Sequence, residues 1–147
     1  MESVEEFIKE LRQKIELPLE MDGHGGCMFL IDDSLSIHID SETSRRFALV
    51  VAELGSIPSG AYRQNILEAA LKSNGAQPPL YGTLALSQQS DDLLLFEFLL
   101  LKPLSIDQAM VFLDKFVEKA FVWHEALKDG SVPETSGPKK SPRLFGL

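Results

Sequence analysis

Apolar side chains recur at helical spacing in the first part of the chain. Residues 3–17 place them on one helical face, at Val4, Phe7, Ile8, Leu11 and Ile15. Ser3 and Glu6 have the spacing of a capping box, so we expect the helix to begin there. Pro18 lacks a backbone donor and predicts that the helix ends near Leu17.

Two further segments show the same helical period. The first covers residues 59–74, with Ser59 as the expected N-cap and Gly75 as a left-handed stop. The second begins at a capping-box pattern, Ser105 with Gln108, keeps an apolar face for about six turns, and ends before Gly130. The pattern therefore predicts three helices.

Between the helices, apolar residues form short runs typical of strands. Leu35, Ile37 and Ile39 alternate with polar residues, which predicts an antiparallel strand with one wet face. The expected strands cover residues 27–32, 35–40, 46–54, 80–87 and 92–101, and residues 21–26 are expected to be a loop. The order is α-β-β-β-α-β-β-α, which predicts an α+β fold with three helices and a twisted, antiparallel, five-stranded sheet.

Composition fits one globular domain. The chain has 147 residues, of which 44% are hydrophobic and 24% charged. We expect the domain to cover residues 1–130, followed by a Pro/Ser/Gly-rich tail, residues 131–147, that is disordered. The net charge of −8 and the lack of a Lys/Arg stripe argue against nucleic-acid binding.

The same features indicate a cytoplasmic location. Cys27 is the single cysteine and cannot form an internal disulfide, which fits a reducing compartment. The N-terminus carries early acids and does not resemble a secretory signal. The longest apolar run, residues 93–101, contains Glu97 and is too short to span a bilayer, so we expect no stable membrane insertion.

Candidate catalytic groups are few. His24 and Cys27 could form a nucleophile–base pair, but no third group is evident to orient them. His38 and Asp40 share a predicted wet face and are too few for a metal site. We therefore expect no catalytic residue, cofactor or metal, and a small Cys/His enzyme is the less favoured alternative.

The apolar strand faces point instead to binding. Within residues 92–101, Leu93, Leu95 and Leu99 point one way and Leu94, Phe96, Phe98 and Leu100 the other. Three helices are barely enough to cover both faces of five strands, which predicts an interface with another chain. An extended partner segment could lie on such a face or add to a sheet edge. The strand at residues 93–101 itself is expected to be mainly sheet core.

Taken together, these segments resemble a known family, the class I type III secretion chaperones of the Tir chaperone family. The resemblance covers about residues 3–128. It depends on the order and spacing of several motifs together, more than on any one motif. They are residues 54–58 (LGSIP), 66–74 (ILEAALKSN), 82–86 (GTLAL), 93–96 (LLLF), the later Pro103-Leu104, and 116–123 (FVEKAFVW).

The resemblance implies a bacterial, cytoplasmic homodimer without enzymatic activity. Such proteins bind the N-terminal chaperone-binding region of secreted effectors as an extended chain, keep it soluble and export-competent, and release it at the secretion ATPase complex. The implied dimer interface comprises Ile66, Leu67, Ala70, Leu71, Tyr81 and Leu84. The implied effector-binding residues are Phe7, Leu11, Phe29, Ile31, Ile37 and Ile39. A regulatory dimer of the same fold that binds a folded partner remains the alternative.

Overall fold

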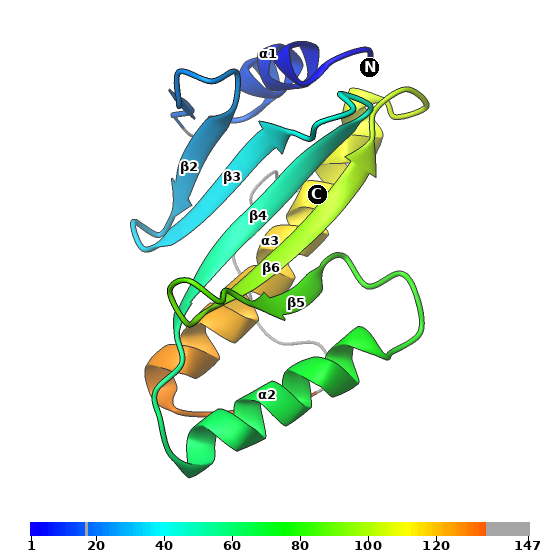
Figure 1. Cartoon of the computed structure of the whole chain (residues 1–147). Helices are drawn as coiled ribbons and strands as arrows, with labels where there is room; N and C mark the ends of the chain where they lie inside the picture. The colour runs from blue at the N-terminus through cyan, green and yellow to red at the C-terminus, as the bar shows by residue number, and fades with distance from the viewer. Residues whose placement is uncertain (17, 135–147) are drawn as a thin grey trace.

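Three helices and six strands form in the computed structural model, which describes residues 1–16 and 18–134 (Figure 1). The helices are α1 (Val4–Lys14), α2 (Ala61–Asn74) and α3 (Ile106–Asp129). The strands are β1 (Glu20–Met21), β2 (Cys27–Ile31), β3 (Leu35–Ser41), β4 (Phe47–Ser56), β5 (Thr83–Leu86) and β6 (Asp92–Leu100). Of the tail expected at residues 131–147, residues 135–147 lie outside the described part of the chain.

The strands form one antiparallel sheet in the order β1-β2-β3-β4-β6-β5. The α+β class and the three helices are confirmed, but the prediction of five strands was wrong. The additional strand, β1, pairs Glu20 with Met28 and Met21 with Cys27. Both of its residues are exposed, so no alternation of apolar and polar positions marks it in the sequence.

The helix ends follow the predicted local capping with three exceptions. Ser105 and Gln108 form the predicted capping box, and Gly130 ends α3 in the left-handed conformation. Ser3 accepts a hydrogen bond from the Glu6 N–H at 3.1 Å as expected, but α1 ends at Lys14, earlier than the predicted Leu17. The N-cap of α2 is Gly60 and not Ser59, and no side chain caps this helix. The helix ends before Gly75 as predicted, but Gly75 has a φ of −89° and is not left-handed.

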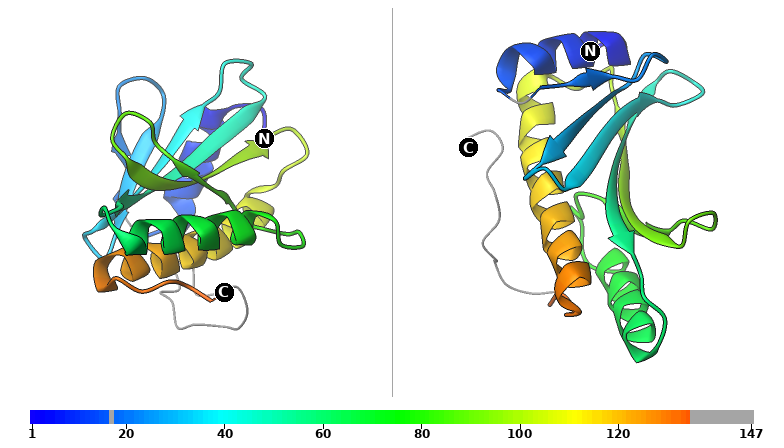
Figure 2. Two further views of the ribbon diagram at one scale, coloured as in Figure 1. Left: turned by 60° about the horizontal axis from the view of Figure 1, so that its bottom comes forward. Right: turned by 90° about the vertical axis from the view of Figure 1, so that its left-hand side faces the viewer.

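Helices cover one face of the sheet. Figure 2 shows α3 running along this face with α1 across its end, while α2 lies at the far end beside β5. The covered, inner face supplies the strand residues of the core at alternate positions. Its fully buried members include Leu35, Ile37, Ile39, Val50, Leu93 and Leu95, which pack with Phe7, Leu11 and Phe116 of the helices.

A buried histidine joins three parts of this core. His124 of α3 places Nδ1 2.7 Å from the Leu54 carbonyl and Nε2 3.2 Å from the Ser34 hydroxyl. A carbonyl only accepts, so Nδ1 carries the proton and Nε2 accepts from Ser34. His124 is therefore a packed structural residue.

Candidate functional site

The six residues implied in effector binding all lie in the core. Their exposed fractions run from 0 to 4%, for Phe7, Leu11, Phe29, Ile31, Ile37 and Ile39. The four strand residues occupy the positions that face α1 and α3. The polar residues between them, such as Ser36, His38 and Asp40, were the sequence signal that this set faces inward. In the single chain these six side chains therefore support the sheet and build no open surface.

The opposite face of β4 and β6 is apolar and uncovered. We name it the outer apolar patch, and its members are Phe47, Leu49, Val51, Leu94, Phe96, Phe98 and Leu100. Phe98 is 49% exposed and Leu100 is 44% exposed. Within the described ranges no helix covers this face (Figure 2). The sequence placed the strand at residues 93–101 in the core, which holds for only one of its two faces.

Strand register builds the patch as neighbouring pairs of large side chains. Phe47 lies opposite Leu100, Leu49 opposite Phe98, and Val51 opposite Phe96. The Phe98 ring lies edge-on to both of its neighbours, with its centroid 6.2 Å from that of Phe47 and 6.0 Å from that of Phe96. An aromatic cluster of this size that is open to water is typical of a binding surface.

Towards β2 the same face becomes polar. The Nε2 atom of His38 lies 3.6 Å from Glu53 Oε1 without forming a hydrogen bond. Burial and a hydrogen bond shared with the Asp22 carboxyl raise the pKa of Asp40. A Cβ at Gly26 would collide with the Asp40 carboxylate, which explains why a glycine stands at this point of the loop before β2. Apolar character returns at the sheet edge with Leu30, which is 41% exposed.

The residues implied in dimerisation divide between core and surface. Ile66, Ala70 and Leu84 are buried, whereas Leu67 and Tyr81 are half-buried. Leu71 projects outward with 73% of its area exposed, which makes it the most exposed large apolar side chain of the described residues. The structure thus leaves Leu71, beside the half-buried Leu67, as an apolar contact point on α2.

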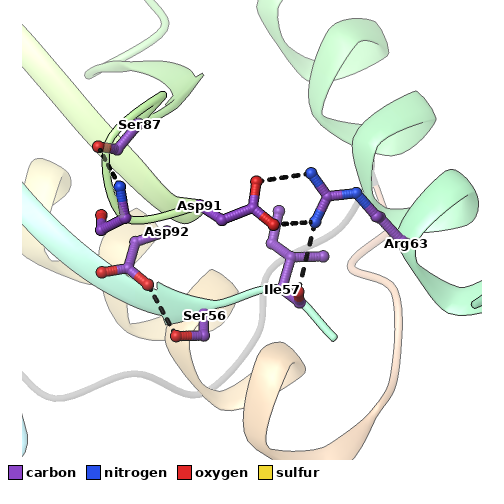
Figure 3. Close-up of polar contacts among 7 residues, drawn as sticks. Ser56, Ile57, Arg63, Ser87, Asp91 and Asp92 are labelled. Carbon is purple, nitrogen blue, oxygen red and sulfur yellow. Dashed lines mark hydrogen bonds and ion pairs between the residues drawn. The ribbon is translucent and has the colours of Figure 1, made fainter. Parts of the chain in front are cut away.

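Polar contacts fix α2 against the sheet. The Asn74 side chain bonds both backbone groups of Leu84, at 2.8 Å and 2.9 Å, and so occupies the outer edge of β5. At the other end of α2, Arg63 donates two hydrogen bonds of 2.7 Å to Asp91, which lies in the turn between β5 and β6 (Figure 3). These bonds lower the pKa of Asp91. The exposed face of α2 is therefore held in one orientation.

Tyr81 is held in place by a half-buried lysine of α3. Lys119 Nζ donates to the carbonyls of Leu80 and Gly82 at 2.9 Å and 2.8 Å, and burial lowers its pKa. The two carbonyls flank Tyr81, whose ring lies 6.2 Å from that of Phe112. The segment that leads into β5 is thereby attached to the core.

The pair proposed for catalysis does not have the properties of a nucleophile and base. Cys27 is 1% exposed, and burial raises the pKa of its thiol to about 11. His24 lies in the exposed loop before β2. In residues 1–16 and 18–134, no group of three or more His, Cys, Asp or Glu side chains is arranged to hold a metal ion. Over the same ranges, no helix has both the length and the hydropathy that crossing a membrane requires.

Solved structures of similar fold come from protein complexes. One belongs to the HopA1–SchA chaperone–effector complex, with 21% identity, a TM-score of 0.59, and coverage of 84% of this chain and 91% of the other. A second belongs to the ExsC–ExsE complex, with 18% identity, a TM-score of 0.62, and coverage of 84% of this chain and 92% of the other. A third belongs to the complex of the Yersinia pestis type III secretion chaperone SycH with a stable fragment of YscM2. It has 22% identity, a TM-score of 0.54, and coverage of 80% of this chain and 93% of the other.

Sequence comparison defines the relationship further. The curated proteins give no significant match. The Tir chaperone protein (CesT) family matches over residues 6–124, which is most of the chain. The protein therefore belongs to the Tir chaperone protein (CesT) family.

Proposed function

We propose that the protein acts as a homodimeric type III secretion chaperone that holds the N-terminal region of a secreted effector on its outer apolar patch. Membership of the Tir chaperone family makes it a type III secretion chaperone, a class that works by binding and not by catalysis. SchA and SycH, which share its fold, were each solved with a bound partner. By analogy, we expect this chain to bind an effector in the bacterial cytoplasm.

The open aromatic face is the observation that carries this proposal. Phe98 and Leu100 are almost half exposed although both belong to an apolar cluster. A partner that covers them removes apolar area from water, at about 25 cal/mol per Å². An open sheet face of this kind suits an extended or amphipathic segment of another chain.

The free edge of β2 offers a second contact for the same segment. β1 pairs only with Cys27 and Met28, so in the described part of the chain no strand lies beside the backbone of residues 29–31. An effector strand could add to this edge through main-chain hydrogen bonds. Phe29 and Ile31 would then contribute backbone groups, while their side chains stay in the core with Ile37 and Ile39.

We further propose that α2 forms the dimer interface. Leu71 and Leu67 would pack against the same residues of a second copy, since a twofold axis brings identical surfaces together. Ile66, Ala70, Tyr81 and Leu84 would support the contact from beneath. Release of the effector by the secretion ATPase complex completes the proposed cycle.

The proposal is tested by capturing the bound effector, the client, in its native host and mapping the region of it that is bound. The tagged protein is purified from the native bacterium, and the complex is treated with protease before mass spectrometry. We expect a protected segment near the N-terminus of a secreted protein, lost in Phe98→Ser and retained in the matched control Val111→Ser. Val111 is 50% exposed, on α3.

A second measurement separates the two candidate functions. Deleting the gene should lower the secretion of the captured protein if the chain is an export chaperone. Unchanged secretion, together with a captured partner that resists protease as a folded protein, would instead favour the regulatory dimer.

A further inference from the structure

A cluster of positive charge lies at one end of the sheet in this acidic protein. Arg45 and Arg46 lie in the turn between β3 and β4, and Lys102 follows β6. All three are exposed and line a cavity of about 490 Å³ together with Met1, Glu2, Leu100 and Leu101. Figure 1 shows the two loops side by side near the N-terminus, whereas α2 lies at the opposite end of the sheet.

Backbone hydrogen bonds bring these cations together. The N–H of Leu101 donates to the Arg46 carbonyl at 3.0 Å, which holds Lys102 next to the arginine turn. The turn itself closes through a 2.9 Å bond from the Arg45 N–H to the Glu42 carbonyl. The cluster is therefore built by the fold and is not a chance meeting of long side chains.

The acids nearby leave the cations without ion-pair partners. The Glu42 carboxylate accepts a hydrogen bond from the Ser44 N–H at 2.9 Å, and among the described residues it forms no ion pair. Glu2 is the one acidic side chain that lines the cavity. Among the described residues, no ion pair involves Arg45, Arg46 or Lys102. The cluster is thus available to carboxylates of another molecule.

This cluster is continuous with the outer apolar patch. Leu100 belongs to the patch and also lines the cavity. The Arg46 guanidinium lies 5.8 Å from the centroid of the Phe47 ring, a cation–π distance. A segment that crosses the patch towards this end therefore passes from aromatic rings directly to positive charge.

We propose that the client segment carries carboxylates directly next to the apolar residues that cover the patch, and that Arg45, Arg46 and Lys102 bind them. The inference rests on the proposed client surface and adds the chemistry of its occupant. The chain's own residues 135–147 do not suit this site, because Lys139, Lys140 and Arg143 repeat its charge. A net charge of −8 repels acidic segments elsewhere, so this cluster would fix which end of the client lies there.

Two synthetic peptides test the inference by fluorescence anisotropy. Both carry fluorescein and the segment Leu-Ser-Phe-Ser-Leu-Ser-Leu, followed by three glutamates in one and three lysines in the other. At low salt we expect the glutamate peptide to bind at least about tenfold more tightly than the lysine peptide. Arg46→Glu and high salt should each remove most of this advantage. Lys9→Glu, the same charge change at an exposed residue of α1, should preserve it.

The outcomes separate this inference from the proposed function. Equal binding of both peptides, or tighter binding of the lysine peptide, overturns the inference. If both bind equally and Phe98→Ser abolishes both, the client surface stands and only the acidic preference fails. If neither peptide binds at millimolar concentration, the outer apolar patch fails as a client surface. Circular dichroism of each variant shows that its fold is retained.

Discussion

Leu71→Asp tests the proposed dimer with little risk to the fold of the single chain. The side chain is 73% exposed, so its replacement leaves the core intact. In the proposed dimer, the same side chain would be buried twice, once in each protomer. We expect the variant to be a folded monomer at concentrations where the wild type is a dimer.

The size of the effect follows from the exposed area. Full burial of a leucine side chain contributes about 1.5–3 kcal/mol. With 73% of Leu71 still exposed, about 1–2 kcal/mol remains to be gained in each protomer. Leu71→Asp removes this burial from both protomers, a loss of about 2–4 kcal/mol, which raises the dimer Kd by about 30- to 700-fold. The two aspartates would also repel each other, so this is a lower limit.

Sedimentation velocity over a dilution series measures the two dissociation constants. Val111→Asp is the matched control, because it places the same charge at a half-exposed residue of α3, away from α2. A Leu71→Asp protein with the wild-type Kd would refute the α2 interface. So would a wild-type protein that is monomeric at every concentration, or an equal loss of dimer in the control.

Three further predictions concern the core, the thiol and the ion pair. Ile37→Ala should lower the free energy of unfolding in urea by about 2–5 kcal/mol, because Ile37 is fully buried, and a loss below about 1 kcal/mol would contradict its place in the core. Cys27, with its pKa raised to about 11, should react with thiol reagents far more slowly in the native protein than in urea, and rapid native labelling at neutral pH would revive the enzyme hypothesis. Arg63 lowers the folded pKa of Asp91, so their bond stabilises the protein above the unfolded pKa of 3.8 and is lost as the pH falls through the lower folded value. The difference in unfolding free energy between wild type and Asp91→Asn should therefore shrink on acidification below that range, and a difference that grows would show the opposite sign.

Much of the local structure could be predicted because it depends on neighbours in sequence. The capping box at Ser105 and the stop at Gly130 define α3, since each acts through groups within one helical turn. The strand that the sequence did not predict, β1, is also formed by residues close together in the chain. β1 consists of two exposed residues, and its pairing depends on β2, so periodicity could not reveal it.

The candidate site was predicted less well for a different reason. Sequence alternation divides each strand into two sets of side chains, and in β3 the polar set identifies the outer face. In β6 both sets are apolar, so alternation alone could not tell which one is covered. The implied effector-binding residues came instead from the family resemblance, and for Ile37 and Ile39 the alternation within β3 already indicated that they face inward.

The sequence by itself determined that this chain is an α+β protein with three helices, apolar strands and an ordered set of Tir chaperone motifs, because these properties depend on residue type and spacing. Only the tertiary structure decided which apolar face stays open. That outcome depends on where α1 and α3 dock and on the register between β4 and β6, both of which join residues far apart in the chain. The same long-range contacts place Arg46 beside Lys102, a meeting that no local pattern could predict.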